Sequence, residues 1–600
     1  MHRVFRSGLA LMFLLVGVGA VAAEPVHAIA MHGAPKLPDG FSHLPYANPD
    51  APKGGRLRLG MAGSFDSVNP MIVKGEKVAG VREFSVESLM MRGLDEPFTL
   101  YGLLAERVDV PEDRTSITFH LNPKATFADG HPVTADDVIF SLELLRDKGV
   151  PTIFGSYYKK VTSTERLSDR VVRMNMDGQD RELPLILGLM PVLPKHKVDA
   201  ATFDQSTLKP LLGSGPYQVS RVDPGRSITY KRNPDYWGRD LPVARGRFNF
   251  DEVRYDYYRD ASILLEAFKT GMIDVRLDDD PTMWAKTGTF KAAQDGRVVR
   301  EEMPTGMPAG MNALVMNSRR PAFADQRVRQ ALILLFDFEW INATLYDGRY
   351  KRTQSYFERS VLASTGLAAD ERERALLAPF ADKVKPEVMD GTFRMPVSDG
   401  SGYNRDNARR ALQLFNEAGY ELRGDRLVDA KTGARYGFEI LVTKGGSERL
   451  MLAYIGALQS LGIDAQLRSI DSPQLIGRIN TFDFDIIMQT WQQSLSPGNE
   501  QWGRFGSAAA KAQGSRNYAG VDNAAVDAMI TALLAAQTPD EFTSAVHALD
   551  RVLVSGDYVI PLFHVPSQWV SSWRTLRHPE TLPLWGYNID TWWAEPTKTQ

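Results

Sequence analysis

The chain has 600 residues, contains no cysteine and carries a formal net charge of −3, from 70 Lys and Arg against 73 Asp and Glu. The missing cysteine excludes disulfides, thiolate metal sites and thiol nucleophiles, and the balanced charge argues against a nucleic-acid partner. With 43% hydrophobic and 24% charged residues, the composition is that of a globular protein with several folding units.

The N-terminus has the pattern of a secretory signal peptide. Arg3 and Arg6 precede an apolar run over 9–18, and small residues follow at 19–23. This run of about ten residues is shorter than the twenty or so that a membrane-spanning helix needs. We expect residues 1–23 to be cleaved, and without cysteine the protein is not a lipoprotein. Export without an anchor predicts the periplasm of a Gram-negative cell.

The next part of the chain predicts an extended arm and the start of a first domain. Residues 24–55 contain six prolines and end in a Gly-Gly pair, which disfavours a regular helix. Residues 56–61 alternate polar and apolar side chains, as a half-buried strand does. Thr134 and Asp137 have capping-box spacing at the start of a predicted helix over about 135–147, and Asp325 is expected to cap another helix.

The stretch 438–491 predicts a parallel sheet. A strand over 438–442, a helix over 447–461 that ends at Gly462, and a strand over 463–467 form a β-α-β unit with a right-handed crossover. A helix over 472–479 and a strand over 484–489 extend it. Ligands of open α/β sheets bind beyond the carboxyl ends of strands, which makes 443–446 and 489–494 candidate site segments.

Three motifs resemble those of the family 5 extracellular solute-binding proteins, the oligopeptide and dipeptide receptors of ABC importers. They are FADGHPVTADDV at 127–138, GPY at 215–217 with YKRNPDYWG at 230–238, and PAFADQRVRQAL at 321–332. Segments of the arm at 32–35 and 46–55, with 336–340 and 355–357, resemble the YejA-like branch. That branch is associated with the uptake of peptides, including the antibiotic microcin C and cell-wall peptide fragments.

The resemblance implies an α/β, two-lobed periplasmic binding protein fold of type II, in the large peptide-binding subclass, with a hinge and an extra inserted subdomain. Lobe I is expected to comprise 24–86, 210–309 and 546–600, with the inserted subdomain at 87–209. Lobe II is expected to comprise 310–545. The lobes would close over a peptide ligand and pass it to an inner-membrane ABC permease. Such a protein is a monomer, needs no cofactor and is not an enzyme.

The resemblance also implies which residues contact the ligand. In lobe I this is the loop Lys74, Gly75 and Glu76, with an ordinary polar loop as the alternative. In lobe II, Trp491 is expected to stack on the ligand beside the amides of Gln492 and Gln493. A buried structural tryptophan is the alternative there.

The chain is expected to cross between the lobes near 310–317 and to return near 554–565. A second group of candidate ligand residues lies near this return crossing and in a lobe II loop. Arg352 would pair with a ligand carboxylate or phosphate, with a solvated face as the alternative. Phe563 and His564 would line the pocket wall unless they are core positions. Tyr350 and Tyr356 fall in the same loop region as Arg352.

Ser494 departs from the family pattern. The oligopeptide and dipeptide receptors hold the ligand's α-amine on an aspartate three residues after the tryptophan, where this chain has Ser494. Because a buried ammonium without a counter-charge costs several kcal/mol, the serine favours a ligand whose amine is blocked or bound elsewhere. Asp485 and Glu500 are the acids that would otherwise restore an amine site.

Two other functions stay open from sequence. A receptor for a metal chelate, haem or glycan is the alternative within the family, and a periplasmic peptide hydrolase is the alternative outside it. The chain lacks the G-x-S-x-G, H-E-x-x-H, G-x-G-x-x-G and phosphate-loop motifs of common enzymes. The histidines are scattered and the acids at 278–280 precede a proline, which favours a solvated turn, so no metal site is predicted.

Overall fold

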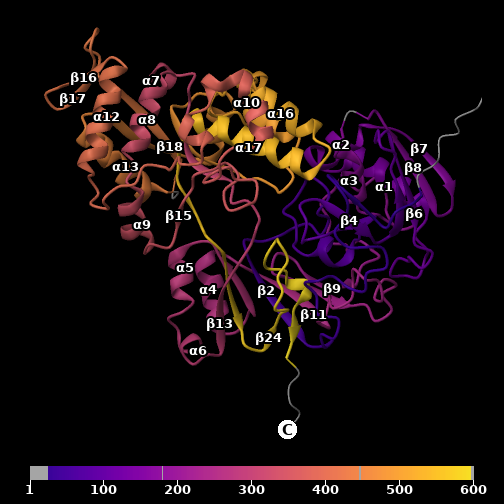
Figure 1. Ribbon diagram of the computed structural model, residues 1–600. Coiled ribbons are helices and arrows are strands. Elements are labelled where there is room, and N and C mark those ends of the chain that lie inside the picture. The colour runs from indigo at the N-terminus through magenta and orange to yellow at the C-terminus, as the bar shows by residue number, and fades with distance from the viewer. Residues whose placement is uncertain (1–23, 179, 445–446, 596–600) are drawn as a thin grey trace, which may run out of the picture.

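The computed structural model describes residues 24–178, 180–444 and 447–595, and it shows an α/β protein with several separate sheets (Figure 1). The predicted signal peptide at 1–23 lies outside the described residues. Within the described ranges, no helix is long and apolar enough to cross a membrane. The elements form two groups joined by two connecting segments, and we name these groups lobe I and lobe II.

Lobe I begins with the arm and two sheets. The first sheet has the order β1-β4-β3 and takes its edge strand from the arm, and the second has the order β2-β11-β10-β9. The predicted strand at 56–61 is confirmed as β2, which buries Leu57 and Leu59. The strands are β1 (Ala28–Ala30), β2 (Arg56–Ala62), β3 (Met90–Arg92), β4 (Thr99–Gly102), β9 (Tyr217–Asp223), β10 (Ser227–Arg232) and β11 (Glu252–Tyr258).

A four-stranded antiparallel sheet with the order β5-β6-β8-β7 and three helices lies within 87–209. Its helix α1 has the predicted capping box, because Asp137 accepts a hydrogen bond from the Thr134 backbone N–H at 2.9 Å. The elements are β5 (Ala105–Asp109), β6 (Ser116–Leu121), α1 (Ala135–Lys148), α2 (Ser156–Tyr158), β7 (Val161–Ser168), β8 (Val171–Met176) and α3 (Leu183–Gly188).

The last large sheet of lobe I joins the middle of the chain to its C-terminal part. Strand β23 lies between β12 and β13 and is antiparallel to both. Asp278, expected in a solvated turn, is instead a buried residue of β12 whose carboxylate lies 2.7 Å from Arg276 Nη2. The elements are α4 (Ala261–Lys269), β12 (Val275–Asp278), α5 (Pro281–Lys286), α6 (Lys291–Gln294), β13 (Val298–Met303), β23 (Gln568–Trp573), β24 (Leu576–Arg577) and β25 (Trp593–Ala594).

Lobe II is built on a five-stranded sheet with the order β19-β18-β20-β14-β21. The predicted β-α-β-α-β run is confirmed, since β18 pairs in parallel with both β19 and β20. Gly462 has the expected positive φ of 80° after the helix. The elements are β14 (Met311–Met316), β18 (Gly437–Thr443), α13 (Glu448–Ser460), β19 (Asp464–Ile470), α14 (Ser472–Asn480), β20 (Ile486–Trp491) and β21 (Val559–Pro561).

Helices cover both faces of this sheet, and alternate residues of each strand belong to different cores. In β14, Ala313 and Val315 pack toward α16 and α17, while Leu314 and Met316 pack toward α8 and α13. Asp325 caps α8 as predicted by accepting from the Arg327 N–H. The helices are α7 (Pro321–Ala324), α8 (Gln326–Leu334), α9 (Phe338–Tyr346), α10 (Glu371–Leu377), α11 (Pro386–Met389), α12 (Arg405–Glu417), α15 (Glu500–Phe505), α16 (Ala524–Ala535) and α17 (Pro539–Ser555).

Residues 304–310 and 562–567 connect the lobes, since β13 and β23 lie in a lobe I sheet and β14 and β21 in the lobe II sheet. One side chain binds both segments: Arg359 donates to Met307 O at 3.2 Å and to Val565 O at 2.8 Å. The boundary expected between 545 and 546 falls inside α17, which packs on α16 along its length. We therefore describe α17 and β21 with lobe II.

Candidate functional site

The lobe I candidates Lys74, Gly75 and Glu76 lie in an exposed loop that is folded onto its own lobe. The Glu76 carbonyl accepts from the Asp66 N–H at 3.0 Å, and the Glu76 N–H donates to Asp66 Oδ1 at 2.7 Å. Lys74 Nζ donates to Gln205 Oε1 at 3.1 Å. Gly75 has a φ of 81°, a conformation that favours glycine. The loop is therefore well supported and leaves two charged side chains at its surface.

The aromatic candidates Trp491 and Tyr356 lie together in the core of lobe II. Trp491 is 3% exposed, and its indole N–H donates to the Arg516 carbonyl at 3.1 Å. The two rings are 6.1 Å apart, and both pack on Phe505. This packing fits the alternative of a structural tryptophan, and it leaves the chain beyond Trp491, rather than the indole ring, to face a ligand.

The three residues after Trp491 differ in exposure. Gln492 and Ser494 are exposed, while Gln493 is buried and accepts from Arg504 at 2.7 Å and from Gln501 at 2.9 Å. The Gln493 side chain thus fixes this segment onto α15. Because exposed and buried side chains alternate along this segment, Gln492, Ser494 and the backbone between them lie exposed at the carboxyl end of β20. Open α/β sheets bind their ligands at such strand ends.

Tyr350 and Phe563 stack beside the connecting segments. Their ring centroids are 4.3 Å apart, and the Tyr350 hydroxyl donates to the Asp279 carbonyl of lobe I at 3.2 Å. His564 pairs with Lys351 in the small sheet of β15 (Lys351–Arg352) and β22 (Phe563–His564), and burial lowers the pKa of His564 to about 4. The structure therefore brings Tyr350, Phe563 and His564 together at the junction of the lobes.

Arg352 has an unusual environment in the same small sheet. Its three guanidinium nitrogens are buried and have no hydrogen-bond partner among the described residues. The guanidinium lies 4.7 Å from the Phe336 ring centroid and 5.6 Å from that of Phe338. Burial lowers the pKa of Arg352 to about 10, so the group still carries its charge at neutral pH. A buried guanidinium whose hydrogen-bond donors are all unused matches an anionic ligand group in charge and geometry.

The two acids considered as substitutes for the missing aspartate lie in different places. Asp485 precedes β20, accepts from the Glu439 N–H and lies 3.6 Å from Arg320, so β20 separates it from Ser494. Glu500, like Ser494, follows the carboxyl end of β20, and its carboxylate accepts from the Gly498 N–H at 3.0 Å. Of the two acids, Glu500 alone adjoins the segment that follows Trp491.

A second carboxylate reaches this place from lobe I, and sequence reasoning missed it. An ideal Cβ on Gly498 would lie 2.7 Å from Glu182 Oε2 and 3.4 Å from Glu500 Oε2, so both acids adjoin the same glycine. Burial, followed by the charges of Glu500 and Asp180, raises the pKa of Glu182 to about 8. The lobes also touch where the arm residue His32 stacks on Phe542 of α17 at 4.2 Å.

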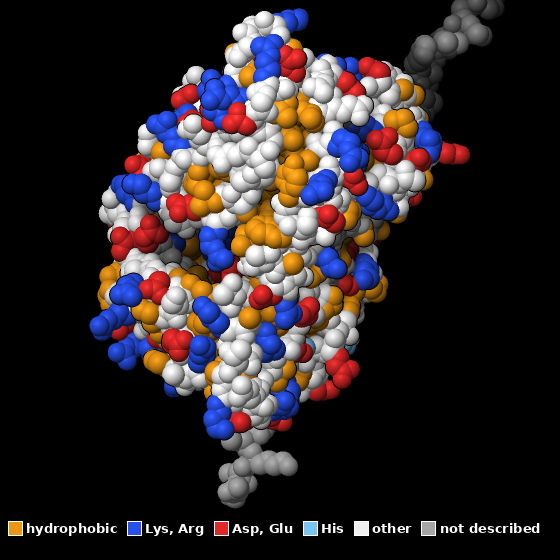
Figure 2. Space-filling view, turned by 90° about the vertical axis from the view of Figure 1, so that its left-hand side faces the viewer, with side chains coloured by type: hydrophobic (Ala, Val, Ile, Leu, Met, Phe, Trp, Pro, Cys, Tyr) orange, Lys and Arg blue, Asp and Glu red, His pale blue; other side chains and the backbone are white. Residues whose placement is uncertain are grey.

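The space-filling view shows a hollow between the upper and lower parts of the molecule, with charged side chains at its rim (Figure 2). The candidates from sequence do not form one cluster. Tyr350, Arg352, Phe563 and His564 lie at the lobe junction, the 492–494 segment lies at the end of β20, and the 74–76 loop lies on lobe I. Such a distribution over two lobes suits a ligand bound between them.

Two lobes joined by two connecting segments, with polar candidate segments on each, are the architecture of a solute-binding protein. Residues 99–513 match the family described as "Bacterial extracellular solute-binding proteins, family 5 Middle". The chain belongs to family 5 of the bacterial extracellular solute-binding proteins. Proteins of this family are non-catalytic substrate-binding proteins of ABC importers, so the expectation that the protein is not an enzyme is confirmed.

Relatives match along nearly the whole chain. A binding protein of Brucella melitensis is 47% identical, with 98% of each chain covered. The Peptidoglycan-binding protein YepA of Agrobacterium fabrum is 44% identical, with 96% of each covered. The protein named Probable peptide-binding protein YejA, from the same organism, is 41% identical over 94% of this chain and 93% of its own. The resemblance to the YejA-like branch is confirmed.

Solved structures share the fold. AppA of Bacillus subtilis in complex with a nonapeptide matches with a TM-score of 0.63 and 20% identity, covering 91% of this chain and all of AppA. NikA of Brucella suis in complex with Fe(III)-EDTA matches with a TM-score of 0.66 and 18% identity, covering 87% and 96%. These likenesses confirm the predicted α/β periplasmic binding protein fold.

Proposed function

We propose that this protein captures peptides in the periplasm and delivers them to an inner-membrane ABC permease. Relatives named for peptide and peptidoglycan binding support this proposal. It includes cleavage of residues 1–23, the absence of a lipid anchor and a monomeric receptor. The lobe division proposed with it places the hinge at 304–310 and 562–567.

The buried guanidinium of Arg352, which has no hydrogen-bond partner among the described residues, is the observation that carries the ligand assignment. A buried guanidinium that makes no hydrogen bond is costly inside a protein, and a carboxylate offers it two parallel hydrogen bonds. Peptides carry carboxylates at the C-terminus and on acidic side chains. Because Arg352 pairs with Phe563 in the β15–β22 register, a ligand held here would also touch the lobe junction.

The main chain of the peptide would pair with exposed backbone. Peptide receptors that tolerate many sequences bind the ligand as an added strand, and side chains then occupy wet pockets. The 492–494 segment in lobe II and the 74–76 loop in lobe I are our candidates for this pairing. Closure of the lobes would be favoured by the ligand's higher affinity for the closed form.

The ligand in this proposal has a blocked α-amine or an amine bound away from Ser494, as in a formylated peptide or an acylated wall fragment. Glu182 and Glu500 beside Gly498 are the place where a free amine would bind instead. Calorimetry with a free-amine peptide and its N-formylated twin tests this point. We expect the formylated twin to bind at least as tightly, and a clear preference for the free amine would contradict the proposal.

Mass spectrometry of ligand carried through native purification identifies the class directly. The protein is purified without denaturant, then denatured, and the released small molecules are analysed. We expect peptides or peptide-containing wall fragments. Release of a metal chelate, haem or glycan would favour the alternative receptor class, since Arg352 also suits the carboxylates of a chelate. Shortened peptides after incubation would indicate a hydrolase and overturn the assignment.

The substitution Arg352→Gln tests whether Arg352 binds a carboxylate of the ligand. We expect the affinity for a carboxylate-bearing ligand to fall about tenfold or more, because a charge-assisted hydrogen-bonded pair is lost. Lys351→Gln, on the exposed neighbouring position of β15, is the matched control and should bind normally. The thermal midpoint without ligand should stay the same or rise. A lower midpoint with unchanged affinity would mean that Arg352 has a structural role only.

A further inference from the structure

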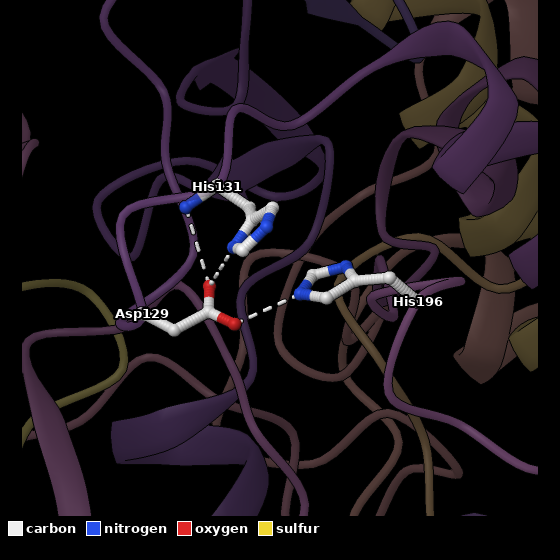
Figure 3. Close-up of side chains that lie close together, drawn as sticks. All are labelled: Asp129, His131 and His196. Atoms are coloured by element: carbon white, nitrogen blue, oxygen red, sulfur yellow. Dashed lines mark hydrogen bonds and ion pairs between the residues drawn. The ribbon is translucent and has the colours of Figure 1, made fainter.

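Three side chains with metal-binding groups meet on the surface of lobe I (Figure 3). His196 Nε2 lies 2.8 Å from Asp129 Oδ2, and His131 Nδ1 lies 3.2 Å from Asp129 Oδ1. The two imidazole rings are stacked, with centroids 4.2 Å apart. One ligand atom from each residue lies within 4.8 Å of the other two.

We propose that Asp129, His131 and His196 form a binding site for a divalent transition-metal ion of the zinc class. The ligand atoms of a tetrahedral zinc site are about 2.0–2.1 Å from the ion, so neighbouring ligand atoms are about 3.3 Å apart. The separations of 2.8 and 3.2 Å, to the two oxygens of Asp129, are already close to this value, and a side-chain movement of about 1–2 Å would bring the widest spacing, at most 4.8 Å, to it. The ion would take the place of the ring protons that face the Asp129 carboxylate.

The donor set decides the kind of ion. Two imidazole nitrogens suit zinc, nickel or copper, whereas calcium and magnesium prefer oxygen ligands alone. Three protein ligands leave the fourth tetrahedral position open, and water would occupy it. Sequence reasoning missed the site because Asp129 and His196 are 67 positions apart in the chain.

The two loops that carry these residues are held on one frame. In the first loop, the Phe127 N–H donates to the His131 carbonyl at 2.8 Å, and the Phe127 ring is buried. In the second, the Lys195 N–H donates to Asp137 of the α1 capping box at 2.9 Å. The His196 ring packs edge-on against Phe127 with centroids 5.9 Å apart. These contacts hold the two loops in place without using the three ligand atoms.

The cluster is open to solvent, and one cation competes for it. The side chains of Asp129, His131 and His196 are 22%, 60% and 31% exposed, so an ion can reach all three. Lys197 Nζ lies 3.8 Å from Asp129 Oδ2 and would move away when the metal binds. Exposed lysine side chains are flexible, which makes this movement inexpensive.

Isothermal titration calorimetry with zinc chloride, on the full mature chain without a polyhistidine tag, tests the site. We expect one zinc ion per chain, and affinity about tenfold or more weaker in His131→Ala and in His196→Ala. His43→Ala is the matched control, since this partly exposed histidine contacts Ser42 outside the cluster. Zinc should also raise the thermal midpoint of the wild type, and raise that of His131→Ala by clearly less at the same zinc concentration.

His131 is the decisive position because its side chain is mostly exposed and its loss spares the core. Circular dichroism checks that each variant is folded, and anomalous diffraction at the zinc edge of soaked crystals locates the ion. A peak between the three side chains would support the proposal. Absence of saturable binding in the wild type, unchanged affinity in His131→Ala, or a peak elsewhere would overturn it.

Discussion

The aromatic pair of the YKRNPDYWG motif has a structural partner in the core of lobe I. The Tyr236 hydroxyl and the Trp237 indole N–H both donate to the buried carboxylate of Glu87. Burial, which outweighs these hydrogen bonds, raises the pKa of Glu87 to about 7. Tyr236 and Trp237, which helped to predict the family from the sequence, therefore have a structural role in the core of lobe I.

Glu87 should make stability depend on pH. Because its pKa rises from 4.5 on folding, the native state holds a proton that the unfolded state has released between about pH 4.5 and 7. The wild type should therefore lose up to about 3 kcal/mol of unfolding free energy relative to Glu87→Gln across that range. Urea unfolding at pH 5 and pH 8 measures the change, with exposed Glu83→Gln as control. A pH-independent difference would contradict this assignment.

At the scale of elements, local periodicity predicted the helices and strands of the β-α-β-α-β run well. It did not predict pairing between strands that are far apart in the chain. The run from 438 to 489 was predicted as β-α-β-α-β because each segment shows its own period. The end of β20 was placed two residues early, since the strand continues to Trp491 only because it pairs with Met311 and Asn312 of β14. Such a partner, far away in the chain, leaves no trace in the local pattern of the strand.

At Gly310, a positive φ and a close backbone contact both disfavour any other residue. It has a φ of 72°, and an ideal Cβ there would lie 2.2 Å from the Trp491 carbonyl oxygen. Gly348, with a φ of 70° and open space around it, is a matched control for the strain of the φ angle alone. We expect Gly348→Ala to cost about 1 kcal/mol and Gly310→Ala about 3 kcal/mol or more in urea unfolding. Equal losses would contradict the clash.

At the scale of the molecule, the two-lobed fold followed from resemblance, but the meeting of distant side chains did not. Glu182 and Glu500 approach one glycine from different lobes, and Asp129 and His196 come from separate loops. Neither pair has a spacing that a sequence pattern can express. Candidate segments were predicted at 74–76 and 489–494, whereas the burial of Trp491 depends on a core assembled from several elements.

The Glu182 carboxyl should couple lobe contact to pH. It faces Glu500 and Asp180 as well as the cations Arg92 and Lys160, and its pKa is raised to about 8 where the lobes touch. In separated lobes, water would return the pKa toward 4.5, so contact takes up a proton and weakens as pH rises toward 8. Small-angle scattering without ligand should show a larger radius of gyration at pH 8.5 than at pH 6. Glu182→Gln should remove this difference, and an unchanged difference in the variant would contradict the coupling.

The Arg359 guanidinium has a mechanical consequence. Since it donates to one carbonyl on each of the two connecting segments, it ties these segments to each other, and they should move together. Two segments that are tied side by side bend more easily about one axis than they twist. The lobes would then rotate about a single hinge axis, and their facing polar surfaces would return to the same alignment each time the lobes close.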